Sequence, residues 1–230
     1  MIQALIAAFT DLREPGIRRV LGKSLILALG VLALTAVLVW LLVVWLTDLQ
    51  IGWLDSIIEF AAGLGVVVLA WLLFPVAVSS TVGVFLDEVS DAVEARHYPA
   101  LPPAPGQPLA AEIKSALAFA GIALALNLLL LPLYLLLFFL PPLYALIFYG
   151  VNGYLLGREY FEQVALRRLD PAAARMLRRA HQGQVLLAGV VIAFLLTVPL
   201  VNLIAPVVAT AFMLHLVTGL TRPGAQAKGG

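Results

Sequence analysis

The sequence predicts an all-α integral membrane protein, and three observations lead to that fold class. Residues 24–47, 60–86, 115–157 and 180–221 contain no Asp, Glu, Lys or Arg. Each run can cross or deeply enter a bilayer, because about 20 apolar residues match its roughly 30 Å hydrocarbon core. The 230 residues are 63% hydrophobic and 12% charged, against about 25% charged in soluble domains. A water-soluble globular protein is therefore excluded.

The first elements are a short helix in the membrane interface and a long spanning helix. Apolar residues recur at helical spacing at Ile2, Leu5, Ile6, Phe9 and Leu12, with Gln3, Thr10 and Asp11 elsewhere on the wheel. This pattern suits a helix that lies in the interface. Pro15-Gly16 ends it, and Pro15 suits the first position of the next helix. A basic cluster then leads into the first span, roughly 24–47.

A second span is expected at about 60–80, and its helical pattern continues to Glu94. One face of this extension is apolar and the other acidic: Leu86, Val89 and Val93 against Asp87, Asp91 and Glu94. The acidic face is expected to be solvated or to pair with arginines of the segment 158–179, and a cation site is the less favoured interpretation. The proline-rich stretch 98–108 predicts an extended connector.

The two remaining apolar blocks, 115–157 and 180–221, predict two helical hairpins. Each block contains helix breakers near its middle: Pro132, Pro141 and Pro142 in the first, Pro199 and Pro206 around Asn202 in the second. The turns are expected in or near the membrane, and the sequence leaves full spans and re-entrant hairpins both open. Between the blocks, Asp170-Pro171 predicts an N-cap and first helical residue for a short helix, Ala172–Arg179.

Basic residues predict the orientation. The N-terminal segment has four, the 48–59 loop none, the 87–114 segment two, the 158–179 segment six and the tail two. All basic segments fall on one side, which should be cytoplasmic, so the N-terminus is expected in the cytoplasm. Residues 1–221 are expected to form a single membrane domain, with a flexible tail at 222–230. The start lacks the basic region of a signal peptide and is expected to be retained.

No constellation of residues indicates an enzyme. The chain has no cysteine, and no catalytic nucleophile, phosphate-binding glycine loop or metal motif is recognisable. We expect no catalytic residues, cofactor, metal site or nucleic-acid partner. Gly150 and Gly153 indicate close helix packing. Asn127, Asn152, Asn202 and Thr197 are expected to hydrogen-bond within the bundle, with Asn202 a candidate for a pore. His181 and His215 have no partner at useful spacing.

The strongest local signal is Glu14-Pro15-Gly16-Ile17-Arg18-Arg19. A helix N-terminus offers unpaired backbone N–H groups and the positive end of the helix dipole. Proline begins the helix, glycine lets an ion approach the backbone, and two guanidinium groups follow within one turn. This combination suits a tetrahedral oxyanion. The alternative is that Arg18, Arg19 and Lys23 are anchors that contact lipid headgroups.

The same stretch, Pro15-Gly16-Ile17-Arg18-Arg19 before an apolar helix, resembles the CysZ-type bacterial sulfate permeases of the CysZ/etoposide-induced protein family. Phe74-Pro75 ahead of a long helix with an acidic end, and the segment from Pro199 to Pro206, also match that family. The resemblance covers nearly the whole chain. It implies two long transmembrane helices and two hairpins that penetrate the bilayer only partly.

The resemblance also implies a function, a site and an assembly. Proteins of this family take up sulfate for cysteine synthesis through the bacterial inner membrane, without a nucleotide-binding partner. Their sulfate site is a Gly-X-Arg-Arg turn, matched here by Gly16, Ile17, Arg18 and Arg19. They form homo-oligomers such as hexamers whose protomers can lie in opposite orientations, whereas the basic bias of this chain favours a single orientation. The alternative function is a non-transporting scaffold whose Arg-rich cytoplasmic segment binds lipid headgroups or a protein partner.

Overall fold

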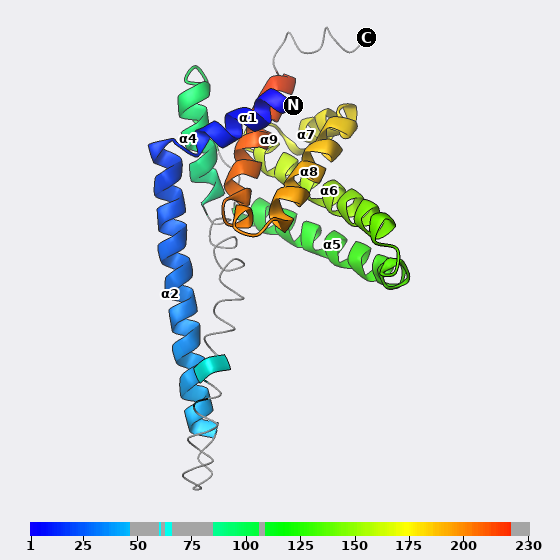
Figure 1. Ribbon diagram of the computed structural model, residues 1–230. Coiled ribbons are helices and arrows are strands. Elements are labelled where there is room, and N and C mark those ends of the chain that lie inside the picture. Colours follow the sequence, from blue (N-terminus) through cyan, green and yellow to red (C-terminus); the bar gives the residue numbers. More distant parts are fainter. Residues whose placement is uncertain (47–59, 61–62, 66–84, 106–108, 222–230) are drawn as a thin grey trace.

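The computed structural model describes residues 1–46, 60, 63–65, 85–105 and 109–221. For residues 42–46 and 109–116 it describes the backbone alone. Every regular element within these residues is helical (Figure 1), which confirms the all-α fold class. The helices are α1 (Ile2–Asp11), α2 (Pro15–Leu46), α4 (Leu86–His97), α5 (Leu109–Leu137), α6 (Pro141–Ala165), α7 (Pro171–Ala180), α8 (Gln182–Thr197), a 3-10 turn η1 (Val201–Leu203) and α9 (Ala205–Thr221).

Two helices of the described residues are long and apolar enough to cross a membrane. They are Pro15–Leu41 of α2 and Leu117–Leu137 of α5. Only 11% of the most apolar 18-residue stretch of the first helix is buried, and only 6% of that of the second. Such exposed apolar surfaces suit contact with lipid. The first expected span is thus confirmed. The second, 60–80, lies outside the described residues except for 60 and 63–65.

The first hairpin is formed by α5 and α6, which lean away from α2 (Figure 1). Its turn lies at residues 138–140, and Pro141 and Pro142 occupy the first positions of α6. The prediction that Pro132 breaks the helix is wrong, because α5 continues through it to Leu137. A proline costs one backbone hydrogen bond, and transmembrane helices tolerate this where neighbouring groups satisfy the freed carbonyl.

The second hairpin is formed by α8 and α9, joined by a tight turn around η1. Leu200 has φ of 67° in this turn, a left-handed conformation that is uncommon for a residue with a branched side chain. Pro206 lies in the first turn of α9, where a missing N–H costs nothing. The helix α7 precedes α8 at an angle of 88°, so the chain turns sharply into the hairpin.

Three glycines hold α6 and α8 together. A Cβ placed on Gly157 would lie 2.4 Å from the carbonyl oxygen of Val185, and one on Gly189 would lie 1.9 Å from that of Gly153. Close approach of two backbones is the usual role of small residues between membrane helices. The expected packing role is confirmed for Gly153, while a Cβ on Gly150 would meet nothing within 4 Å.

The core is centred on α9, whose residues Ala205 to Leu214 are all buried. The helix α1 lies against α9, as does α4 (Figure 1). Ile2 and Ile6 of α1 are exposed, and the location of α1 in the membrane interface stays a prediction. Asp11, expected on its polar side, is instead fully buried. The cause is a set of partners far away in the sequence, described below.

Candidate functional site

The start of α2 has the backbone geometry that an anion site needs. Glu14 precedes the helix and its carbonyl accepts the N–H of Arg18 at 2.9 Å. Pro15 has no N–H to donate. Within the described part of the chain, the N–H groups of Gly16 and Ile17 donate to no acceptor. Two free donors therefore remain at the positive end of the helix.

The side chains of Arg18 and Arg19 are exposed, and neither makes an ion pair with a described residue. Their charged neighbours are engaged. The Glu14 carboxylate is bound by Arg96 of α4, and the ammonium group of Lys23 lies 2.7 Å from the Glu88 carboxylate. Because Arg96 neutralises Glu14, the nearest carboxylate in the sequence does not oppose an anion at this turn.

Gly16 and Ile17 serve packing as well as the backbone site. The Ile17 side chain is fully buried, so only its backbone is available to a ligand. A Cβ on Gly16 would lie 3.1 Å from the Cβ of Ala92 in α4. Glycine at this position therefore also serves the close packing of α2 against α4. The approach of an ion to its backbone stays a prediction.

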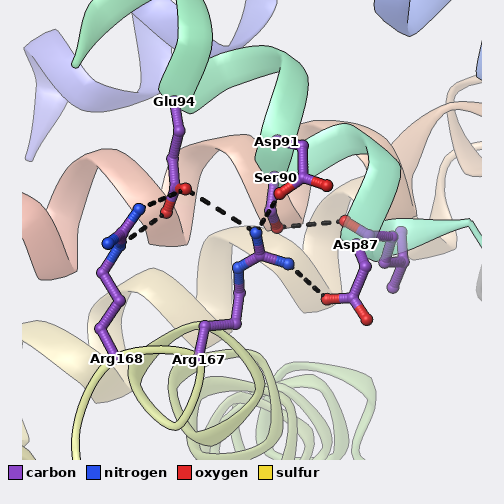
Figure 2. Close-up of polar contacts among 7 residues, drawn as sticks. Asp87, Ser90, Asp91, Glu94, Arg167 and Arg168 are labelled. Atoms are coloured by element: carbon purple, nitrogen blue, oxygen red, sulfur yellow. Dashed lines mark hydrogen bonds and ion pairs between the residues drawn. The ribbon is translucent and has the colours of Figure 1, made fainter. Parts of the chain in front are cut away.

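The second arginine-rich region lies at the end of α6, where α4 supplies the acidic partners (Figure 2). The Arg167 side chain is 6% exposed and lies 2.6 Å from Asp87, with Asp91 bound by its other terminal nitrogen. Arg168 donates to both oxygens of Glu94, at 3.1 and 2.7 Å. Pairing of the acidic face with arginines was one of the interpretations left open, and it is the one observed.

The rest of segment 158–179 is also organised internally. Arg158 and Arg178 lie 2.9 and 3.5 Å from the Glu162 carboxylate. The Asp170 side chain accepts the N–H groups of Ala172 and Ala173, which confirms the predicted N-cap of α7. The hydrogen bonds from these N–H groups, with that of Ala173 the larger cause, hold the pKa of Asp170 below its ordinary value. Arg175 and Arg179 are exposed and make no ion pair with a described residue.

A cluster that the sequence did not predict joins α1, α4 and α9. The Asp11 carboxylate lies 2.7 Å from Nε2 of His97 and 2.9 Å from Nε2 of His215. The hydroxyl of Tyr98 lies 2.8 Å from Nδ1 of His215. The expectation that His215 has no partner is therefore wrong. More than 80 residues separate Asp11 from His97 in the sequence, so no local spacing reveals the contact.

The polar residues of the apolar blocks are mostly satisfied by neighbouring groups. Asn127 and Asn152 each donate to the carbonyl one helical turn earlier, at 2.8 Å. Thr197 contacts the Tyr149 hydroxyl at 3.0 Å. The expected bond between helices is observed for Thr197, whereas Asn127 and Asn152 bond to carbonyls of their own helices. Asn202 is half-buried in the turn of the second hairpin, and its role in a pore stays a prediction.

A family model described as "Sulfate transporter CysZ/Etoposide-induced protein 2.4" matches residues 4–206 of the chain. The match includes the Gly16–Arg19 turn, both hairpin turns and the arginine-rich end of α6. Comparisons with curated proteins and with solved structures give no match.

Proposed function

This chain belongs to the sulfate transporter CysZ/etoposide-induced protein 2.4 family, and we propose that it takes up sulfate through the bacterial inner membrane for cysteine synthesis. It acts as a channel or passive permease. Sulfate, or a related oxyanion, binds at the turn formed by Gly16, Ile17, Arg18 and Arg19. From there it passes along a path lined by polar residues and helix ends.

The observation that carries the proposal is that Arg18 and Arg19 make no ion pair with a described residue. Both side chains are exposed at a helix start where two backbone N–H groups have no acceptor in the described part of the chain. The nearby Lys23 and Arg96 are paired with carboxylates. Charge-assisted hydrogen bonds from guanidinium and backbone N–H groups match the oxygens of a tetrahedral dianion.

The arrangement of charges supports a single orientation with the N-terminus in the cytoplasm. Ion pairs join the start of α2 to α4, through Lys23 and Glu88, and α4 to the end of α6, through Asp87 and Arg167. Three basic segments thus gather at one end of the molecule (Figure 1). The positive-inside rule places such an end in the cytoplasm.

Sulfate entry through a passive path has an energetic condition. Moving an anion into an inside-negative cell costs about 2.3 kcal/mol per charge per 100 mV. Net entry of a dianion then requires that the cell keeps free sulfate low by consuming it. Assimilation of sulfate into cysteine provides such consumption.

Homo-oligomerisation, with a hexamer as the expected state, is part of the proposal. The apolar faces of α2 and α5 are almost entirely unburied within the chain, which leaves them available to lipid or to further copies. Native mass spectrometry from nanodiscs measures the state directly. An active monomer would contradict this part of the proposal.

The test compares two double variants in the same assays. Sulfate binding is measured by calorimetry and sulfate flux in proteoliposomes, for the wild type, for Arg18→Ala with Arg19→Ala, and for Arg175→Ala with Arg179→Ala. The second pair is a matched control, because it also removes two exposed arginines that make no ion pair with a described residue. We expect the first variant to lose binding and flux and the second to retain both.

A scaffold that binds lipid headgroups or a partner protein is the second candidate function, favoured by the exposed Arg175 and Arg179 of α7. It predicts no sulfate flux in any variant and weaker binding of anionic vesicles by the Arg175→Ala, Arg179→Ala protein. Sulfate binding equal to that of the wild type in the Arg18→Ala, Arg19→Ala protein would place the oxyanion site elsewhere.

A further inference from the structure

The cluster of Asp11, His97 and His215 brings three metal-ligating groups to one point. Each residue offers one ligand atom, and these atoms all lie within 4.8 Å of one another. They come from α1, α4 and α9, which meet at one end of the molecule (Figure 1). The Asp11 side chain is 1% exposed and that of His215 6%, whereas His97 is 31% exposed.

The ligand set matches the preferences of a borderline divalent cation. Zinc binds imidazole nitrogen and carboxylate oxygen at about 2.0–2.2 Å, which places the ligand atoms of a tetrahedral site roughly 3.3 Å apart. In the structure Nε2 of His97 lies 2.7 Å from Oδ1 of Asp11, and Nε2 of His215 lies 2.9 Å from Oδ2. These side chains are in hydrogen-bond contact, and they would rotate and separate slightly to hold an ion.

The surroundings of His215 also fit a metal ligand. A histidine that binds metal through Nε2 must carry its proton on Nδ1 and usually donates it to a second group. Here the Tyr98 hydroxyl lies 2.8 Å from Nδ1 of His215 and can accept that proton. An ion at Nε2 would replace the present contact of that atom with the Asp11 carboxylate, and Nδ1 would then donate to Tyr98.

A cavity of about 380 Å³ borders the cluster and supplies an entry path. Tyr98 and His215 form part of its lining, together with Gln3 of α1 and Gln184 of α8. The cavity has room for the water that occupies the fourth position of an open zinc site. Metal binding requires neutral imidazoles, and with them the single carboxylate would give the site one negative charge, which favours a divalent cation over an anion.

We propose that Asp11, His97 and His215 bind one divalent transition-metal ion of the zinc class per chain, with Tyr98 as the partner of His215. The ion joins the interfacial helix α1 to α4 and α9. Because α1 ends four residues before Pro15, the ion also fixes the position of the turn that begins α2. The alternative is a network of hydrogen bonds that holds the same helices without an ion.

The test uses purified protein without a histidine tag, stripped of metal with a chelator. Cobalt(II) is titrated as a spectroscopic probe, and bound zinc is measured by elemental analysis after gel filtration. We expect one ion per chain and the visible absorption bands of four-coordinate cobalt. Zinc should raise the unfolding temperature in a concentration-dependent manner, because it binds only the folded state.

One control and four variants of the cluster give the result its specificity. His181→Ala is the matched control, because His181 is the one histidine of the sequence that lies outside the cluster. It should bind like the wild type, whereas His97→Ala, Asp11→Asn and His215→Gln should lose stoichiometric binding. Tyr98→Phe should weaken binding by about ten- to a hundredfold, as expected for an outer partner of a ligand.

Two results would overturn the proposal. One is the absence of stoichiometric cobalt or zinc binding by the folded wild type. The other is wild-type affinity in His97→Ala, whose partly exposed position makes it the variant best able to fold. Folding is checked by gel filtration and circular dichroism. Sulfate plays no part in these measurements, so their outcome is independent of the proposed transport function.

Discussion

The chain has three Arg-Arg pairs, and two of them differ in their surroundings. Arg18 and Arg19 are exposed at the start of α2 and make no ion pair with a described residue. Arg167 and Arg168, at the end of α6, are bound by three carboxylates of α4 (Figure 2). Position relative to α4 separates a pair available to a ligand from a pair that stabilises the fold.

The register of α4 explains the difference. Asp87, Asp91 and Glu94 recur at helical spacing and face the end of α6. Glu88 lies on another side of the helix and contacts Lys23 instead. No acidic side chain of α4 is bound to Arg18 or Arg19. Among the described residues these two arginines have no carboxylate partner, which is why the proposal places the oxyanion there.

Removal of Arg167 should have the largest effect on stability. Its side chain is 6% exposed, and Arg167→Ala would leave Asp87 and Asp91 without their partner. Breaking a buried pair costs about 3–5 kcal/mol, and because these two carboxylates are largely exposed we expect about 2–3 kcal/mol. Thermal unfolding in detergent measures the loss. Sulfate affinity of the folded fraction should not change, and a matching loss of sulfate binding would contradict the separation of the two pairs.

Arg18→Lys should affect binding and not stability. An ammonium group keeps the charge but loses the planar fork that binds two oxygens, so sulfate affinity should fall roughly tenfold. The unfolding temperature should stay that of the wild type, because the side chain is exposed. Calorimetric titration with sulfate gives the affinity. If lysine replaces arginine without loss, a lipid anchor explains the residue better.

Gly16→Ala should reduce stability because the new methyl group crowds α4. The variant leaves every charge in place. The added Cβ would lie 3.1 Å from the Cβ of Ala92, and crowding of this kind outweighs the helix preference of alanine by about 1 kcal/mol. Ala92→Gly should reverse that part of the loss. A double-mutant cycle on unfolding free energies measures the coupling, and additive single effects would show that the two residues do not interact.

Lys23→Met should have the smallest effect. Both partners of the Lys23–Glu88 pair are 46% exposed, and such pairs contribute about 0–1 kcal/mol. Unfolding in detergent should change within the error of the measurement. A loss as large as that of Arg167→Ala would show that exposure is the wrong criterion for ranking these contacts.

Local features of the fold were predictable from the sequence because short-range physics determines them. Asp170 and Pro171 occupy the N-cap and first helical position as their chemistry requires. Pro15 begins α2 for the same reason. The apolar face of Leu86, Val89 and Val93 is buried as its spacing indicates. The free N–H groups of the Gly16–Arg19 turn likewise follow from a helix start.

Long-range features were not predictable in the same way. The pattern of its own helix predicts that Asp11 is a polar surface residue. It is buried because His97 of α4 and His215 of α9 contact its carboxylate. Pro132 has the chemistry of a helix breaker, yet the helix continues past it. For Asp11 the deciding contacts come from tertiary surroundings that no spacing pattern encodes.

The approach of α6 to α8 has a consequence for the variation that this chain can tolerate. At Gly157 and Gly189 even a methyl group would overlap the backbone of the facing helix. A library that samples every amino acid at each position should therefore accept almost nothing but glycine at these two sites. At Gly150, Gly183 and Gly219, where a methyl group meets open space, the same library should accept many residues. Related sequences should likewise keep glycine at the first two positions and vary at the other three.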